Sequence, residues 1–82
     1  MKLIIALFLL TSFLWSAVDI NSASIEELRS LRGIGNVKAK AIVAYREKNC
    51  FKSVDELVEV KGIGKKTLKK NLSNLSVSEC DK

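Results

Sequence analysis

The chain has 82 residues, 48% hydrophobic and 28% charged, with no histidine, no proline and two cysteines. Its 14 Lys and Arg residues outnumber its 9 Asp and Glu residues, and the formal net charge of +5 is compatible with a polyanionic partner. A chain of this length holds one small domain. Two cysteines without any histidine argue against a protein-only zinc site, and no cofactor is expected.

Residues 1–17 have the pattern of a secretory signal peptide. Lys2 precedes a run of 13 residues from Leu3 to Trp15 that is apolar apart from Thr11 and Ser12, and this run is shorter than the roughly 20 residues that span a bilayer. Ala17 is the best final residue of the signal, although Trp15 is bulky for a position so close to the cleavage point. The alternative is an uncleaved anchor in the inner membrane. Both interpretations place residues 18–82, the folded domain, outside the cytoplasm.

Positive charge is spread unevenly along the exported part. Cleavage after Ala17 removes Lys2 and leaves 65 residues with 13 basic against 9 acidic side chains, a net charge of +4. No acid occurs between Glu59 and Glu79. Five lysines fall in that interval: Lys61, Lys65, Lys66, Lys69 and Lys70.

The first predicted helical hairpin covers about 24–48 and follows an extended lead-in over 18–23. Ser24 and Glu27 fit a capping box at the start of a helix over about 25–31. Apolar side chains at helical spacing predict a second helix, from about Asn36 to Lys48. Its inward side chains are expected to be Ala39, Ile42, Val43 and the stem of Arg46.

The second predicted hairpin covers about 53–75 and follows a short connector. Phe51 in this connector is assigned to the core, as is Tyr45, rather than to base stacking. Ser53 and Glu56 repeat the capping box. The apolar residues of the helix that follows are Val54, Leu57, Val58 and Val60.

The last predicted helix runs from Lys65 to about Leu75, with Leu68, Leu72 and Leu75 facing inward. The tail from Ser76 is expected to be short and irregular, and no strand pattern of any length competes. The predicted fold class is therefore all-α, with about four to five short helices arranged as two hairpins packed against each other.

A Gly-Ile-Gly triplet stands between the two helices of each predicted hairpin. Gly33-Ile34-Gly35 recurs 29 residues later as Gly62-Ile63-Gly64, together with its flanking residues. The glycines end one helix and permit positive φ. Each triplet directly precedes a helix N-terminus, where unpaired amides and the helix dipole attract anions. Ile34 and Ile63 are expected to be buried and to hold the turns in shape.

Lysines near these turns add positive charge. Lys38 and Lys40 follow the first triplet, and Lys65, Lys66 and Lys69 follow the second. Backbone amides and lysines bind the phosphate backbone without contacting the bases. They therefore predict sequence-independent and salt-sensitive binding of nucleic acid. The plainer alternative is that the glycines are helix caps and the lysines a solvated face. Two matched copies favour phosphate binding.

Cys50 and Cys80 are the two cysteines, and in a small exported domain such a pair predicts a disulfide. Closing a loop of about 30 residues contributes roughly 3–4 kcal/mol of stability in the chain-entropy model. An intermolecular bridge and two free thiols are the alternatives.

Several segments together carry a family resemblance. Gly33-Ile34-Gly35-x-x-x-Ala39 resembles the helix-hairpin-helix motif, and two such motifs resemble a double helix-hairpin-helix domain. The runs 20–28, 41–47 and 51–57 are similar to the ComEA family of competence DNA receptors. The resemblance extends over nearly all of the exported part. A short exported chain with this domain alone matches the periplasmic form of that family in Gram-negative bacteria.

The resemblance implies a function, the binding of incoming double-stranded DNA in the periplasm during natural transformation. Further implied partners are the DNA-uptake machinery and inner-membrane channel proteins; no small-molecule substrate is implied. A pseudo-two-fold axis would relate the hairpins, whose turns would contact phosphates of opposite strands across a minor groove. The implied contacts come from the amides around Gly33, Gly35, Val37 and Lys38 and around Gly62, Gly64, Lys66 and Thr67.

The sequence departs from the family pattern in two respects. Arg32, Asn36 and Cys50 stand where the family often has proline, and a Cys50 bridge looks like a substitute for a rigid proline connector. Leu68 stands where the first hairpin has Ala39, so looser packing is expected in the second hairpin.

Two other functions are weighed against DNA binding. A small exported helical bundle could instead dock a protein partner. An enzyme such as a nuclease is not expected, because phosphodiester chemistry needs metal-binding carboxylates grouped at one site, and neither catalytic nor metal-binding residues are evident.

Overall fold

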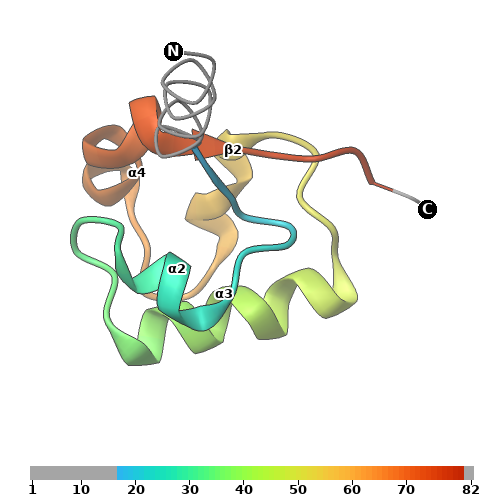
Figure 1. The fold of residues 1–82 in the computed structure, drawn as a ribbon, viewed down its shortest axis with the longest axis horizontal. Coiled ribbons are helices and arrows are strands. Elements are labelled where there is room, and N and C mark those ends of the chain that lie inside the picture. The colour runs from blue at the N-terminus through green and yellow to red at the C-terminus, as the bar shows by residue number, and fades with distance from the viewer. Residues whose placement is uncertain (1–16, 81–82) are drawn as a thin grey trace, which may run out of the picture.

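The computed structural model describes residues 17–80, so the predicted signal peptide lies outside the described residues except for Ala17. The prediction of a mainly helical fold is confirmed (Figure 1). Among the described residues, no helix is both long and apolar enough to cross a membrane. The elements in chain order are β1 (Val18–Asp19), α2 (Ile25–Arg29), α3 (Asn36–Lys48), the 3-10 helix η2 (Val54–Glu59), α4 (Lys65–Asn71), the 3-10 helix η3 (Leu72–Asn74) and β2 (Leu75–Ser76).

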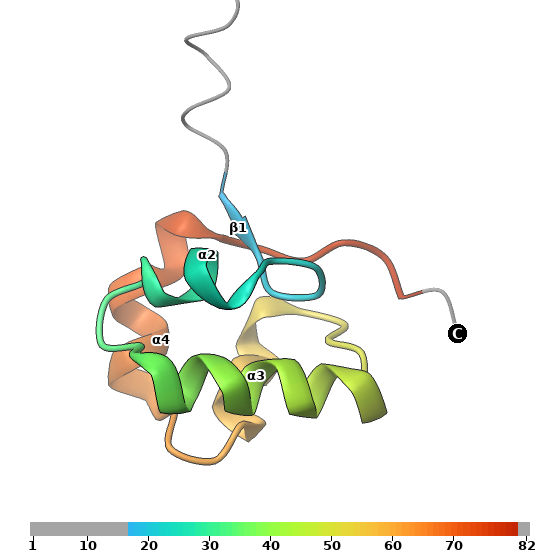
Figure 2. The same ribbon diagram turned by 60° about the horizontal axis from the view of Figure 1, so that its bottom comes forward.

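The first hairpin consists of α2 and α3 and follows the sequence prediction closely. The predicted capping box is present: Ser24 Oγ accepts from the N–H of Glu27 at 3.1 Å, and Glu27 Oε1 accepts from the N–H of Ser24 at 2.9 Å. These bonds satisfy amides that the helix itself leaves unpaired. Helix α2 ends at Arg29, earlier than expected, whereas α3 has the predicted bounds. Figure 2 shows α2 lying above α3, to which the turn at 30–35 connects it.

The second hairpin starts differently from the first, and its predicted capping box is wrong. The Ser53 side chain accepts no capping bond, and Glu56 Oε1 accepts from the N–H of Lys52 at 3.0 Å instead. The helix that follows, η2, is a 3-10 helix with Glu56 N–H donating to Ser53 O at 3.2 Å.

The end of α4 corrects a second prediction. The α-helix ends at Asn71 and tightens into η3, so the helix does not continue to Leu75 as an α-helix. Leu72, predicted to face inward, is 45% exposed, and Asn71 is buried in its place at 1% exposure. Leu68 and Leu75 are buried as predicted.

Two-residue strands join the ends of the described chain. Strands β1 and β2 pair in parallel, with Val18 opposite Leu75 and Asp19 opposite Ser76. Ile20 N–H extends the pairing by donating to Ser76 O at 3.1 Å. In Figure 1, β2 leads from α4 toward the C-terminus along the top of the molecule. The sequence predicted an extended lead-in but an irregular tail, because two residues are too few for a recognisable strand pattern.

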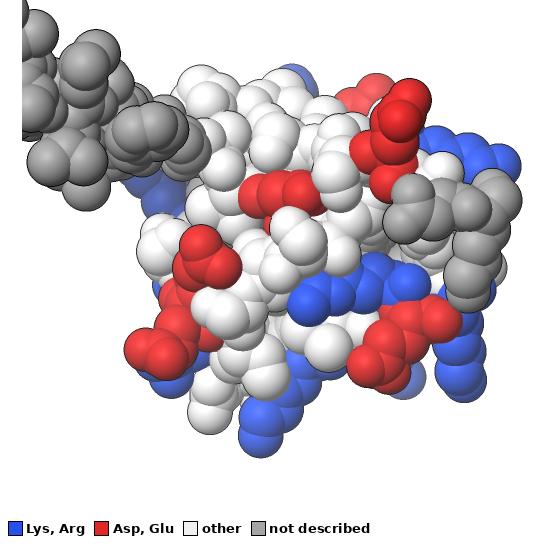
Figure 3. Space-filling model, turned by 45° about the vertical axis from the view of Figure 1, so that its right-hand side comes forward, with Lys and Arg blue, Asp and Glu red and all other residues white. Residues whose placement is uncertain are grey.

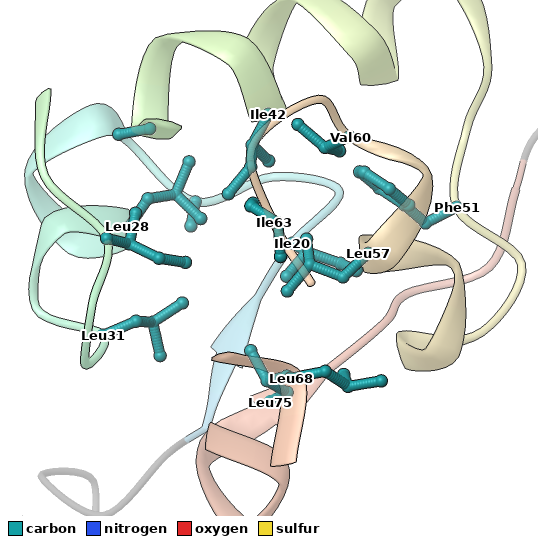
Figure 4. Packing of buried hydrophobic residues seen from close by; sticks show 13 residues of the cluster. Ile20, Leu28, Leu31, Ile42, Phe51, Leu57, Val60, Ile63, Leu68 and Leu75 are labelled. Atoms are coloured by element: carbon teal, nitrogen blue, oxygen red, sulfur yellow. The ribbon is translucent and has the colours of Figure 1, made fainter. Parts of the chain in front are cut away.

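A single hydrophobic core is shared by both hairpins (Figure 4). Phe51 is fully buried, as predicted, and the half-buried Tyr45 ring stacks on it with centroids 4.9 Å apart. Ile34 and Ile63, the central residues of the two triplets, are each 4% exposed, which confirms the prediction that they are buried. The other buried apolar residues are Ile20, Ala23, Leu28, Leu31, Ala39, Ile42, Leu57, Val60, Leu68 and Leu75.

A disulfide between Cys50 and Cys80 fastens the tail to the connector. The two Cα atoms are 5.9 Å apart, within the range that a disulfide spans. The bridge is intramolecular, so of the alternatives considered from the sequence the structure shows pairing within one chain.

Polar contacts near the disulfide form a terminal junction made of Asp19, Asn21, Phe51 and Ser78. The Asn21 amide group bonds to both backbone groups of Phe51, accepting from N at 2.9 Å and donating to O at 2.8 Å, and it donates to Ser78 O at 3.0 Å. The Asp19 carboxylate accepts from the N–H groups of Asn21 at 2.9 Å and Ser78 at 3.1 Å, and from Ser22 Oγ at 2.8 Å. Partial burial raises the pKa of Asp19, but these hydrogen bonds together outweigh it and leave the pKa below its ordinary value.

Candidate nucleic-acid interface

The two glycines of each triplet have different conformations. The first glycine lies in the left-handed region, with φ +77° at Gly33 and +93° at Gly62. The second glycine is the N-cap of the next helix in extended backbone, with φ −99° at Gly35 and −107° at Gly64. The prediction that the glycines permit positive φ is therefore right for the first of each pair and wrong for the second. The left-handed glycine lies in the turn between the two helices, and the extended glycine starts the second of them.

Helices α3 and α4 both begin with unpaired amides. Their first intrahelical bonds run from Ala39 N–H to Gly35 O at 2.9 Å and from Leu68 N–H to Gly64 O at 3.1 Å. Neither N-cap supplies a side-chain hydrogen bond, and neither first turn contains an acid. Helix α2, in contrast, is capped by Ser24 and has two acids in its first turn. The N-termini of α3 and α4 are thus the ones left open to an external anion.

Exposure follows the same repeat as the sequence. All four glycines are exposed, while the isoleucine between each pair is buried. Val37 in the first turn of α3 is 82% exposed, and Lys66 at the matching position of α4 is also exposed. A buried isoleucine therefore anchors each turn in the core and leaves its backbone facing solvent.

Each turn lies against the second helix of the other hairpin. A β-carbon added to Gly33 would stand 3.7 Å from both Cγ2 and Oγ1 of Thr67, and one added to Gly62 would stand 3.8 Å from Cε of Lys38. Lys38 and Thr67 occupy matching positions 29 residues apart, so the two contacts are reciprocal. Figure 2 shows the turn before α4 lying beside α3. The fold brings the two triplets to neighbouring positions.

The lysines predicted to bind phosphate are accessible. Lys40, Lys65, Lys66 and Lys69 are exposed, and Lys38 is half-buried with Nζ donating to Gly33 O at 3.4 Å. The hairpins are unequal in charge, because the first turn of α3 contains Asn36, Val37 and Lys38 where that of α4 contains Lys65, Lys66 and Thr67.

The charged residues elsewhere are mixed. Figure 3 looks at the molecule from the side of the tail, and on that face acidic and basic side chains alternate with uncharged surface. Among residues 17–80, no group of three or more His, Cys, Asp or Glu residues lies close enough to hold a metal ion.

Asn71, which was not among the predicted site residues, links the residue before the first turn to the first turn of α4. Its Oδ1 accepts from the N–H of Arg32 at 2.8 Å, and its Nδ2 donates to Arg32 O at 2.9 Å and to Thr67 O at 2.8 Å. Arg32 directly precedes Gly33, and Thr67 lies in the first turn of α4. The signal that could have revealed Asn71 is its position 29 residues after Ile42, a predicted core residue.

The sequence matches known proteins over most of its length. The helix-hairpin-helix motif family matches residues 15–76. ComE operon protein 1 of Bacillus subtilis is 44% identical over 61 residues, which make up 73% of this chain and 30% of that protein. An uncharacterized protein of Haemophilus influenzae is 54% identical over 56 residues, which make up 66% of this chain and 50% of that protein. Kinesin-like protein KIF22 of Xenopus tropicalis is 46% identical over 48 residues, 57% of this chain and 8% of that protein. The matched region spans half or less of each of these relatives.

Proposed function

The chain belongs to the helix-hairpin-helix family, and from this premise we propose that it binds double-stranded DNA without sequence preference. The proposed contacts are made to backbone phosphates by the two Gly-Ile-Gly turns and the helix N-termini that follow them. The protein acts as an exported receptor that holds DNA during uptake in natural transformation. This role rests on the ComEA resemblance and on the similarity to ComE operon protein 1.

The reciprocal placement of the two turns is the observation that carries the proposal. Thr67 packs beside Gly33, and Lys38 packs beside Gly62, so two uncapped helix N-termini are held next to each other. One such terminus binds an anion weakly, but a duplex presents phosphates on two neighbouring strands. Two linked weak sites bind such a ligand more tightly than either site alone.

The chemistry at each turn suits phosphate rather than bases. Exposed glycines let the backbone approach an oxygen closely, and the free amides and the helix dipole stabilise negative charge there. Lysine side chains supply mobile positive charge around the same points. Such contacts fix the position of a duplex without reading its sequence. The proposed phosphate-binding residues are Gly33, Ile34, Gly35, Val37, Lys38, Lys40, Gly62, Ile63, Gly64, Lys65, Lys66, Thr67 and Lys69.

The proposed organisation follows the sequence prediction. Residues 1–17 act as a signal peptide and residues 18–82 as the DNA-binding domain in the periplasm, where the Cys50–Cys80 disulfide is stable. An uncleaved anchor in the inner membrane would place the same domain on the same side of that membrane. The DNA-uptake machinery and inner-membrane channel proteins are the proposed further partners, and the domain is a binding module rather than an enzyme.

A duplex titration at two salt concentrations tests the proposal. Residues 18–82 are expected to bind unrelated duplexes with similar micromolar affinity, and log K is expected to fall with log salt at a slope of about −3 to −5, as for a few neutralised phosphates. The informative variant carries Gly35→Asp and Gly64→Asp. Nothing lies within 4 Å of a β-carbon at either position, and both have extended backbone, so the substitutions fit.

The Asp side chains in this variant cap α3 and α4 and repel phosphate at the same time. Thermal stability is expected to hold or rise, because Asp is a better N-cap than Gly by a few tenths of a kcal/mol, while duplex binding is lost. If the wild-type protein binds no duplex at low salt, or if its affinity does not depend on salt concentration, the proposed function is wrong.

A shallow apolar hollow of about 340 Å³ favours the second candidate function, docking of a protein partner. Val58, Leu68 and the exposed Leu72 line it, between η2 and α4. If docking through this hollow were the main function, Leu72→Ser would impair it and the Gly35/Gly64 double variant would not.

A further inference from the structure

We infer that Asn71 is a positioning residue that holds the two Gly-Ile-Gly turns in one fixed arrangement, so that both engage the same duplex. The inference rests on the proposed DNA binding and adds to it a residue that need not touch DNA. It concerns how the two turns are linked, which neither the repeat nor the family resemblance describes.

Asn71 uses its whole side-chain amide to join the hairpins. Its contacts to Arg32 N and O form a closed pair of hydrogen bonds of 2.8 and 2.9 Å, and Nδ2 also donates to Thr67 O at 2.8 Å. The side chain is 1% exposed and is the buried polar residue of the core. Burying an amide is unfavourable unless its groups are paired, and here every one of them is used.

The repeat shows what Asn71 replaces. The matching residue in the first hairpin, 29 positions earlier, is Ile42, which is fully buried and apolar. An isoleucine can fill the core, but its side chain cannot hydrogen-bond to backbone, so the two hairpins differ in this support. In consequence, the first turn is held from outside its own hairpin by α4, while residue 42 gives no such support to the second turn.

The hydrogen bonds of Asn71 are made to residues that lie next to the first turn and at the start of α4. The peptide groups of Arg32 lead directly into Gly33, whose φ of +77° shapes the turn between α2 and α3. Thr67 lies beside Gly33 and belongs to the first turn of α4. Asn71 therefore sets the first turn relative to the N-terminus of α4. Binding to two phosphates at once depends on such a fixed separation, because ordering a loose turn on binding opposes association.

The test compares Asn71→Leu with wild type, because leucine closely matches the shape of asparagine and removes only the hydrogen bonds. We expect duplex affinity to fall about five- to tenfold and the salt slope to become shallower by about one, as phosphates of the first turn are released. The control Ile42→Val alters the matching core position, whose side chain makes no hydrogen bond to a turn, and it is expected to keep the wild-type affinity and slope when both variants are folded at the measuring temperature.

A residue-level readout separates positioning from loss of stability. In amide chemical-shift titrations with a short duplex, the wild-type signals of 33–38 and 62–67 should shift in parallel. In Asn71→Leu, the 62–67 signals should shift first, and those of 33–38 only at higher DNA concentration. Parallel shifts and unchanged affinity in this variant overturn the inference, whereas wild-type protein that fails to bind duplex overturns the proposed function itself.

If Asn71→Leu does not fold, amide hydrogen exchange of the wild-type protein tests the inference instead. The N–H of Arg32 should exchange far more slowly than that of its neighbour Gly33, because its partner is the buried Asn71 Oδ1. Equal, fast exchange of both amides would mean that Asn71 does not hold the turn, and the inference would be wrong.

Discussion

Thr67 at the start of α4 lies directly beside Gly33 in the other hairpin, where a β-carbon on the glycine would stand 3.7 Å from its Cγ2 and Oγ1 atoms. The matching pair, Lys38 and Gly62, has almost the same spacing at 3.8 Å. The pairing is reciprocal, so each hairpin's turn is packed against the second helix of the other hairpin. Two uncapped helix N-termini become neighbours through these contacts.

The two glycines of each triplet should respond differently to alanine. Gly33→Ala and Gly62→Ala place a β-carbon on backbone of positive φ, and each should lower the free energy of unfolding by about 1 kcal/mol or more. Gly35→Ala and Gly64→Ala sit on extended backbone with open space around them and should leave stability almost unchanged. Urea unfolding measures the stability of the four variants. Duplex titration should show that Gly35→Ala and Gly64→Ala nevertheless weaken binding, because the new methyl group lies where we propose that phosphate approaches. Equal destabilisation in the two pairs would contradict the assigned conformations.

Val37→Lys should make the hairpins more alike. Val37 is 82% exposed, and its counterpart Lys66 is already a lysine. One more cation at the turn should tighten duplex binding at low salt and steepen the salt slope by about 0.9, the change expected for one additional phosphate contact. Leu72→Lys is the matched control, since Leu72 is also an exposed hydrophobic residue but lies in η3. If both lysines steepen the slope equally, net charge alone governs binding.

Reduction of the disulfide should weaken the fold without changing the DNA site. Loss of the Cys50–Cys80 bridge should lower the free energy of unfolding by roughly 3–4 kcal/mol on the chain-entropy model. Cys50 follows the C-terminal end of α3, and the turn lies at its N-terminal end. Thirteen residues at 1.5 Å each separate these ends by about 20 Å.

Unfolding in guanidinium with and without reductant measures the loss of stability. A duplex titration of the reduced protein, at a low temperature at which it stays folded, measures binding. A large drop in affinity for reduced protein that remains folded would show that the bridge acts on the turns as well. Double replacement of both cysteines by serine should behave as the reduced protein does.

The terminal junction should make stability depend on acid pH through Asp19. Hydrogen bonds to the carboxylate depress its pKa in the folded state, so ionised Asp19 stabilises the fold. That stabilisation is complete above the unfolded-state pKa of about 3.9 and disappears as pH falls through the lower folded-state value. Asp19→Asn should therefore be less stable than wild type at pH 7, and the difference should shrink toward about pH 2. Urea unfolding at several pH values measures it, and a difference independent of pH would contradict the role of the charge.

Identical local patterns did not always produce identical structure. Ser24 with Glu27 and Ser53 with Glu56 have the same spacing, yet only the first pair forms a capping box. Glu56 bonds to the N–H of Lys52 instead, at the start of a 3-10 helix. A capping motif determines which capping hydrogen bonds are possible locally, and the packing of the surrounding chain determines which of them form.

The inward face of the last helix was predicted one residue out of place. The prediction placed Leu72 on this face, but position 71 lies three residues after Leu68 and four before Leu75 and so shares their face. Asn71 then faces the core, and its three hydrogen bonds, two of which cross 39 residues of sequence, hold it there. A hydrophobicity pattern cannot identify a polar residue as inward-facing, because its partners are not local.

The sequence by itself determined the two hairpins, the buried isoleucine inside each glycine turn, the bounds of α3 and the positions of the phosphate-binding candidates, because these depend on residues within one or two helical turns of each other. The sequence also predicted a disulfide between Cys50 and Cys80. Only the tertiary structure decided that Gly33 meets Thr67, that Asn71 links α4 to Arg32, and that Asn21 bonds to Ser78 across 57 residues. Such contacts join segments far apart in the chain, and they form only once the shared core has brought the hairpins together.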